Sequence, residues 1–228
     1  MFMEECKLMY KAVIFDLDGT LVNSLKDLAV ATNYALEQHG FKPYPIDDYK
    51  YLIGDGMAKL IERAIPNDAL TDETFKSVFN GFMDYYREHC LVYTHVYDGM
   101  ENAVKTLSDM GLKLAVVSNK ADDMTNVIVK EFFGDIFMAV AGKREGIPVK
   151  PDPTLTLMIM DEIGVKPHEC IFIGDSGMDC ATAVNSGCYP LGVLWGFRKS
   201  DELLKNGAKT LMSNPNEIIP FVKEMLND

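Results

Sequence analysis

The sequence predicts an α/β fold: a doubly wound parallel sheet with helices on both faces and a helical domain inserted after the first strand. Short apolar segments alternate with helical patterns along most of the chain, an order typical of parallel sheets covered on both sides. One stretch, about residues 23–89, shows helical patterns only and is too long for a simple crossover between strands. The composition, 48% hydrophobic and 25% charged over 228 residues, is that of a globular protein with one large domain or one domain and a smaller companion.

Five short apolar segments are expected to be the buried strands of this sheet, because they are rich in aliphatic residues and are bounded by polar or turn-forming residues. They cover residues 12–15, 113–118, 137–140, 170–174 and 190–195. Between them, apolar residues recur at helical spacing over residues 103–110, 124–132 and 155–163. The first and last of these patterns stop at Gly111 and Gly164, and glycine is common just after a helix.

The inserted segment is expected to form a helical cap over residues 22–94, while residues 1–21 and 95–228 form the core domain. Helices are expected in the cap at about 25–36, 56–64 and 71–88, with proline-containing turns between them. No strand is expected between residues 23 and 89, and the chain returns to the sheet near Val96.

Charge and composition exclude several classes of partner. The chain has 22 Lys and Arg against 34 Asp and Glu, a net charge of −12, and no basic run, so we expect neither nucleic acid nor a membrane as a partner. No run of about 18 apolar residues could span a bilayer, and residues 1–11 lack the pattern of a signal peptide. The five cysteines are odd in number and include no Cys-x-x-Cys pair, so free thiols and a cytoplasmic protein are expected.

Two aspartates follow the first predicted strand, in Phe15-Asp16-Leu17-Asp18-Gly19. Residues two apart in an extended chain face the same side, so Asp16 and Asp18 can point into one site, about 6–7 Å apart along the backbone. Two carboxylates that close repel each other and need a cation or a proton between them. In doubly wound sheets, ligands bind beyond the carboxyl ends of the strands, which is where these acids lie.

Polar residues also follow the other predicted strands. Ser118 and Asn119 end the second strand, Asp175 and Asp179 follow the strand at 170–174, and Lys150 lies in a proline-rich loop. Each has an ordinary structural explanation, since such residues cap helix N-termini and a loop lysine is usually solvated.

The combination at one sheet edge indicates a site for a metal ion and a phosphate. Carboxylate oxygens suit Mg²⁺, which typically takes one or two of them together with water and phosphate oxygens. A lysine suits a phosphoryl oxygen, and a carboxylate that attacks phosphorus forms an aspartyl-phosphate.

Four motifs, DLDGT, VVSNK, VKPDP and GDSGMD, resemble in type and order those of the haloacid dehalogenase (HAD) superfamily. From YDGMENAV to LGVLWGFR the chain is similar to the phosphoglycolate phosphatase-like branch, so the resemblance covers nearly all of it. The resemblance implies a Rossmann-like HAD core with an α-helical cap inserted after the first motif.

The resemblance also implies a role for each acid. Asp16 would be the nucleophile and a Mg²⁺ ligand, and Asp175 the second carboxylate ligand. Asp18 would protonate the leaving alkoxide, then activate water, and would bind Mg²⁺ through its backbone carbonyl. Asp179 would lie near the metal and orient water or Lys150.

The remaining motif residues would bind the phosphate. By the same resemblance, Ser118 and Asn119 would hold the phosphoryl group and Lys150 would neutralise its charge. In the cap, the turn Gly54-Asp55-Gly56 resembles the loop that helps to select the substrate in phosphoglycolate phosphatases, and a plain turn between helices is the alternative.

Other members of the superfamily fit less well. Asp18 argues against a dehalogenase, which has no leaving alkoxide to protonate, and residues 21–27 lack the His found there in phosphomutases such as β-phosphoglucomutase. A phosphonoacetaldehyde hydrolase needs a cap lysine, for which Lys59 is the candidate, although a solvated helix lysine explains it as well. Asn23 stands where many relatives have Asp, which leaves the role of this cap-entry position open.

The expected function is therefore Mg²⁺-dependent hydrolysis of a small phosphorylated metabolite, with phosphoglycolate as the first candidate. Pyrophosphate, nucleotides and sugar phosphates are alternative substrates. A receiver domain, in which the phosphoaspartate is a signal, is the rival from another class, but receivers lack the cap and their first-strand acids are adjacent. The sequence leaves monomer and homodimer both open.

Overall fold

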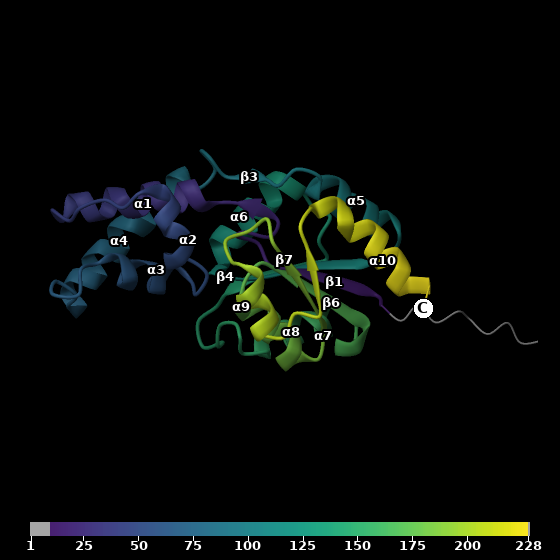
Figure 1. Cartoon of the computed structure of the whole chain (residues 1–228). Helices are drawn as coiled ribbons and strands as arrows, with labels where there is room; N and C mark the ends of the chain where they lie inside the picture. The colour runs from purple at the N-terminus through teal and green to yellow at the C-terminus, as the bar shows by residue number, and fades with distance from the viewer. Residues whose placement is uncertain (1–9, 228) are drawn as a thin grey trace, which may run out of the picture.

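The computed structural model describes residues 10–227. Its centre is a six-stranded sheet in the order β5-β4-β1-β6-β7-β8, in which every neighbouring pair is parallel (Figure 1). The strands are β1 (Ala12–Phe15), β4 (Lys113–Ala121), β5 (Ala139–Lys143), β6 (Cys170–Gly174), β7 (Tyr189–Val193) and β8 (Thr210–Met212). The parallel α/β fold predicted from the sequence is confirmed. The prediction that residues 1–11 are not a signal peptide is not tested, because residues 1–9 lie outside the described ones.

β1 lies at the centre of the sheet because its sequence, AVIF, is apolar on both faces. Val13 and Phe15 belong to the apolar cluster on the first face, and Ala12 and Ile14 belong to the cluster on the second face. All four side chains are fully buried, so helices must cover both sides of this strand.

Helices cover the sheet on both faces. On the first face are α5 (Met100–Asp109), α6 (Asp122–Phe133) and α10 (Ile218–Asn227). On the second are α7 (Thr154–Glu162) and α8 (Gly177–Ser186), with α9 (Ser200–Lys205) beside α8 and β7. Figure 1 shows α5 and α10 on the opposite side of the sheet from α7 and α8. Short 3-10 helices cover Ile46–Asp48, Pro167–Glu169 and Pro215–Glu217.

A group of four helices is inserted between β1 and α5 and lies beside the sheet (Figure 1). They are α1 (Leu25–Gln38), α2 (Tyr49–Leu52), α3 (Met57–Ala64) and α4 (Asp72–His89). The chain enters this insert through β2 (Val22–Asn23) and leaves it through β3 (His95–Val96), and these two short strands pair antiparallel. The cap bounds of 22–94 remain a prediction.

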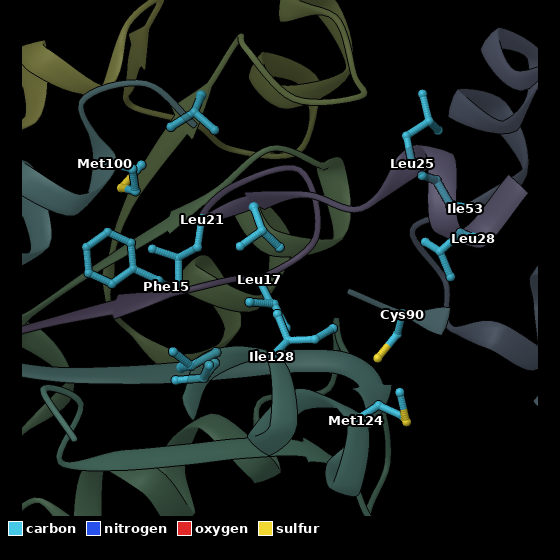
Figure 2. Close-up of a cluster of buried hydrophobic side chains, with 14 of the residues drawn as sticks. Phe15, Leu17, Leu21, Leu25, Leu28, Ile53, Cys90, Met100, Met124 and Ile128 are labelled. Atoms are coloured by element: carbon cyan, nitrogen blue, oxygen red, sulfur yellow. The ribbon is translucent and has the colours of Figure 1, made fainter. Parts of the chain in front are cut away.

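One apolar cluster connects the first face of the sheet with the insert (Figure 2). Leu17 and Leu21 lie in the loop after β1, and Leu25 and Leu28 continue the cluster on α1. These side chains are at most 6% exposed, so the loop that carries the predicted site acids is packed against hydrophobic residues from both sides.

The structure corrects several predicted boundaries. β4 extends to Ala121 rather than to residue 118, and β5 begins at Ala139 rather than at residue 137. β8 and the pair β2 and β3 were not predicted, because two or three residues are too few to show an alternating pattern. The prediction that the chain returns to the central sheet near Val96 is wrong, because Val96 lies in β3, which pairs with β2 in a separate two-stranded sheet. The expectation of no strand from residue 23 onward is wrong only at Asn23, where β2 ends.

The cysteines agree with the expectation of free thiols. Four lie among the described residues, and all are buried and unpaired: Cys90, Cys170, Cys180 and Cys188. Within residues 10–227, no helix has both the length and the apolar character needed to cross a membrane.

Asp27, in the first turn of α1, connects the entry of the insert with its exit. Its carboxylate accepts hydrogen bonds from the backbone N–H groups of Tyr93 and Thr94, at 3.0 and 2.7 Å, and from the Thr94 hydroxyl at 2.7 Å. The side chain is 3% exposed, so water cannot replace these bonds.

Substituting Asp27→Asn should destabilise the protein, because the new amide NH₂ faces backbone donors that it cannot satisfy. Hydrogen bonds to charged groups are worth about 1.5–3 kcal/mol, which for a chain of this size corresponds to a fall in Tm of about 3–12 °C. Thermal unfolding followed by circular dichroism measures the change. Asp68→Asn, at an exposed position, is the matched control and should stay within about 2 °C of the wild type. Equal melting of all three proteins would contradict this role of Asp27.

Candidate active site

The site residues predicted from the sequence meet at the carboxyl edge of the sheet. Asp16 follows β1, Ser118 and Asn119 lie near the end of β4, and Asp175 follows β6. β4 and β6 flank β1 on opposite sides, so the strand order reverses at this point. Ligands of doubly wound sheets bind at such a switch point, beyond the strand ends.

Lys150 reaches the same point from the loop between β5 and α7. Its ammonium group donates hydrogen bonds to Asp16 Oδ1 at 2.7 Å, to Asp179 Oδ1 at 2.6 Å and to the Val117 carbonyl at 3.1 Å. The side chain is only 4% exposed. Burial opposes the charged form, but the two carboxylates outweigh it and raise the pKa of Lys150.

Three buried carboxylates lie close together around this lysine. Asp16, Asp175 and Asp179 each offer an oxygen within 4.8 Å of the other two. Burial and the charge of Asp179 raise the pKa of Asp16 to about 7, although Lys150 opposes this shift. Burial and repulsion by Asp179 and Asp16 raise the pKa of Asp175 well above its ordinary value. One ammonium group therefore does not balance three carboxylates, and the cluster favours a further cation.

This acidic cluster fits a divalent metal ion by the chemistry of its donors. The oxygens of Asp179 are used within the protein, since Oδ1 accepts from Lys150 and Oδ2 accepts from the backbone and hydroxyl of Ser176. In Asp16 only Oδ1 bonds to Lys150, and in Asp175 only Oδ2 bonds to the Phe197 backbone, at 2.7 Å. The second oxygens of Asp16 and Asp175 lie outside these contacts, and hard oxygen donors of this kind suit Mg²⁺.

Asp18 lies apart from this cluster and is held by different residues. The Lys120 ammonium donates to both of its carboxylate oxygens, at 2.8 and 2.9 Å, and the Ser24 hydroxyl donates to Oδ1. Ser24 stands at the N-terminus of α1, but its side chain bonds to Asp18 instead of capping the helix. Beside it, Asn23 Oδ1 accepts from the Leu25 N–H at 3.3 Å, so Asn23 supports the start of α1.

Two glycines allow the backbone to approach the acidic cluster. Gly19 has φ of 89°, in the left-handed region, and a Cβ there would lie 2.3 Å from Asp175 Oδ2. A Cβ on Gly174 would lie 2.2 Å from the Asp179 Cβ. Both glycines of the DLDGT and GDSGMD motifs are therefore required by packing around the acids.

Ser118 and Asn119 differ in how they use their side chains. Ser118 is 3% exposed, and its oxygen accepts from the Lys120 N–H at 3.3 Å, which leaves the hydroxyl proton for another acceptor. Asn119 Oδ1 accepts from the Lys150 N–H at 2.9 Å, and Nδ2 donates to the Lys150 carbonyl at 3.4 Å. The Asn119 side chain thus holds the loop that carries the lysine.

One pocket brings the core acids and the insert together. Asp16, Asp18, Ser118, Lys150 and Asp175 all line it. The insert contributes a mainly apolar wall, made of Leu28, Ile53, Gly54, Gly56, Met57 and Leu60. A bound substrate would therefore lie between charged groups of the core and a wall that excludes water.

The predicted cap loop borders this pocket in part. Gly54 and Gly56 line it, whereas the Asp55 carboxylate pairs with Arg63 and borders a neighbouring groove. Lys59 does not line the pocket, and its ammonium pairs with Glu62 at 2.6 Å on the exposed face of α3.

The family model described as haloacid dehalogenase-like hydrolase matches residues 13–193, which contain every motif residue of the site. The chain belongs to this family. It is 34% identical over 219 residues to the phosphoglycolate phosphatase of Neisseria meningitidis, covering 94% of this chain and 92% of that one. It is 33% identical over 224 residues to the phosphoglycolate phosphatase of Neisseria gonorrhoeae, covering 94% and 91%.

A solved structure from Lactobacillus delbrueckii subsp. bulgaricus, provisionally named a phosphoglycolate phosphatase, superposes with a TM-score of 0.88 at 33% identity. It covers 96% of this chain and 100% of that one. These similarities identify the chain as a HAD-type phosphatase.

Three residues at the site of this HAD phosphatase were missed in the sequence. Lys120 directly follows Ser118 and Asn119 at a strand end, and that position was a usable signal. Arg198 follows β7, whose carboxyl end lies at the same edge of the sheet; it lines the pocket and donates to the backbone carbonyls of Lys50 and Ile53. Ser24 carried no signal beyond that of a helix start.

Substituting Lys150→Met should leave the three acids of the cluster without their counter-charge. Breaking a buried ion pair from one side costs about 3–5 kcal/mol, equivalent here to a fall in Tm of about 6–20 °C. Mg²⁺ should then raise the Tm of the variant more than that of the wild type, because cation binding compensates a larger excess of negative charge. Differential scanning fluorimetry with and without Mg²⁺ measures both effects.

Lys105→Met, at an exposed position on α5, is the control for loss of a lysine charge and should melt like the wild type. If Lys150→Met melts at the wild-type temperature and responds equally to Mg²⁺, the ammonium does not balance the acids.

Proposed function

We propose that this HAD phosphatase hydrolyses a small phosphomonoester through an aspartyl-phosphate formed on Asp16, with Mg²⁺ as its metal and phosphoglycolate as its first candidate substrate. The observation that carries the proposal is one pocket lined by Asp16, Asp18, Ser118 and Lys150. It combines a nucleophile, a proton donor, a hydroxyl donor and a cation, which are the groups that phosphoryl transfer requires.

In the first step, an oxygen of Asp16 attacks the phosphorus and the bond from phosphorus to the ester oxygen breaks. Asp18 gives a proton to the leaving alkoxide, which departs as an alcohol. The Ser118 hydroxyl donates to an oxygen of the phosphoryl group in transfer, and the Lys150 ammonium balances its charge.

In the second step, Asp18 takes a proton from a water molecule that attacks the same phosphorus. The bond between phosphorus and Asp16 breaks, so inorganic phosphate leaves and the Asp16 carboxylate is restored. Asp179 keeps Lys150 in place during both steps, through the contact at 2.6 Å.

Mg²⁺ would be held by Asp16, Asp175 and the backbone carbonyl of Asp18, where it would neutralise the carboxylates and the phosphoryl oxygens. Residues 22–94 would act as the cap, whose Gly54 and Gly56 border the pocket and whose closure would exclude water. The cytoplasmic location and the lack of a nucleic-acid partner stay predictions.

Phosphoglycolate carries a carboxylate as well as a phosphate, and the pocket holds a cation that suits it. Lys120 and Lys150 are each held by acids that line the pocket. Arg198 lines the pocket too, but its carboxylate partner, Glu202 at 3.4 Å, lies outside it. The two terminal nitrogens of Arg198 each donate one hydrogen bond, to the carbonyls of Lys50 and Ile53, and each keeps a second N–H. Arg198 is therefore our candidate for recognising the substrate's carboxylate through these remaining N–H groups.

Asp16→Asn should abolish repeated turnover of p-nitrophenyl phosphate, because an amide does not replace the carboxylate nucleophile. Asp18→Asn should lower kcat for alkyl phosphates by about 10²–10⁴-fold with the fold intact. Phosphate release in the presence of Mg²⁺ measures the effects of both substitutions. The same assay after removal of Mg²⁺ by EDTA measures the metal requirement. A fully active Asp16→Asn protein would overturn the mechanism, and a single stoichiometric phosphorylation of the wild type would favour a phospho-switch instead.

The substrate proposal is tested by ranking kcat/KM for phosphoglycolate, 2-hydroxyethyl phosphate, pyrophosphate, nucleotides and sugar phosphates. Arg198→Leu should lower kcat/KM for phosphoglycolate by about 10–100-fold, the worth of a charged hydrogen bond, and change 2-hydroxyethyl phosphate by less than about threefold. Arg63→Leu is the matched control, because Arg63 also supports the Gly54–Gly56 loop but does not line the pocket. Similar kcat/KM values for all substrates in the wild type would indicate a phosphatase of broad specificity. Equal losses for both substrates in Arg198→Leu would show that Arg198 supports the loop at Ile53 and does not recognise the substrate's carboxylate.

A further inference from the structure

The Lys120 side chain is almost completely buried, although it is not part of the chemistry assigned above. It is 1% exposed, and the only carboxylate it contacts among the described residues is that of Asp18. The contact is symmetric, at 2.8 and 2.9 Å to the two oxygens, and together with the Ser24 hydroxyl, which donates to Oδ1, it holds the carboxylate in one position and orientation. A buried lysine at a strand end is costly without such a partner, and this one is placed where Asp18 needs orientation.

Helix α4 of the insert covers this lysine. The ring of Tyr86 lies with its centroid 4.9 Å from the Lys120 ammonium, within the range of a cation–π contact. Tyr86 is fully buried, and its hydroxyl makes no hydrogen bond of ordinary geometry within residues 10–227. An ammonium group has three N–H donors, and the Asp18 oxygens use two of them, so a small shift of α4 would let the third meet this oxygen.

The two lysines of the pocket divide its carboxylates into separate groups. Lys150 contacts Asp16 and Asp179, which with Asp175 form the compact acidic cluster. Asp18 is not part of that cluster, and Lys120 holds its carboxylate on the side covered by α4. The acids that suit the metal are thus kept apart from the acid that must face the leaving group.

We infer that Lys120 is a positioning residue: it orients the Asp18 carboxylate for proton transfer, and the ring of Tyr86 on α4 covers its ammonium group. The inference rests on the proposed function, because it assumes that Asp18 transfers the proton. It predicts a defect that depends on the leaving group, which a purely structural lysine would not give.

The test compares two substrates in Lys120→Met, which removes the ammonium and keeps an unbranched side chain. An alkyl phosphate, whose alkoxide must be protonated, should lose about 10²–10³-fold in kcat. Release of p-nitrophenolate, which departs without a proton, should lose less than about threefold in the first turnover. The second half-reaction also needs Asp18, so p-nitrophenyl phosphate should give a burst of one product per site followed by slow turnover.

Lys113→Met is the matched control, since Lys113 lies at the other end of β4 and its ammonium contacts the Ile163 carbonyl at 2.6 Å. It should show neither the burst nor the dependence on leaving group. If Lys120→Met fails to fold, as judged by circular dichroism, Lys120→Gln replaces it. The glutamine can still donate one hydrogen bond to Asp18, so it should show the same pattern with a smaller loss.

Equal losses for both substrates without a burst, or a change confined to KM, would overturn the inference. The Asp18→Asn variant separates this failure from a failure of the proposed function. If Asp18→Asn shows the leaving-group pattern and Lys120→Met does not, Asp18 transfers the proton but Lys120 does not position it. If the wild type shows no Mg²⁺-dependent turnover of either substrate, the proposed function itself is wrong.

Discussion

The contact of one ammonium group with two buried carboxylates governs the whole site. Lys150 lies between Asp16 and Asp179 and also bonds to the Val117 carbonyl within β4. Isolated carboxylates at these depths would cost several kcal/mol each, so the ends of β1, β4 and β6 can meet only around a positive charge. The contact therefore stabilises the folded protein as well as preparing the site for its chemistry. Because the position of Lys150 matters in both ways, the Asn119 side chain bonds to the Lys150 backbone and holds its loop in place.

The parallel sheet determines which residues can take part. Its strands carry apolar residues on both faces, so the polar side chains of the site lie at the carboxyl ends of the strands and in the loops that follow them. β1, β4 and β6 are neighbours, and their carboxyl ends bring residues more than a hundred positions apart into direct contact. A side chain at Gly19 or Gly174 would collide with Asp175 or Asp179, so the acids can lie this close to the backbone only where it carries glycine.

Local patterns in the sequence predict the strands and the place of the site, whereas contacts between distant residues leave no such pattern. Five of the six strands of the central sheet and the convergence of Asp16, Ser118 and Asp175 could be predicted, because apolar patterns locate the strands and parallel topology aligns their ends. The bond between Lys120 and Asp18 joins residues 102 positions apart, so the strand-end position of Lys120 could indicate that it lies near the site but not which carboxylate it binds. Ser24 resembles an ordinary helix cap in sequence, and only the fold shows that its hydroxyl turns to Asp18.

The net charge of −12 can coexist with an anionic substrate because charge acts over a short range. At physiological ionic strength, exposed charges are screened beyond about 8 Å, so a small phosphate in the pocket responds mainly to the groups that line it. Those include three cations, Lys120, Lys150 and Arg198, and each of the three lining acids, Asp16, Asp18 and Asp175, already accepts a hydrogen bond. The net charge of the whole chain is therefore compatible with a small phosphorylated substrate, whose binding depends on the groups that line the pocket.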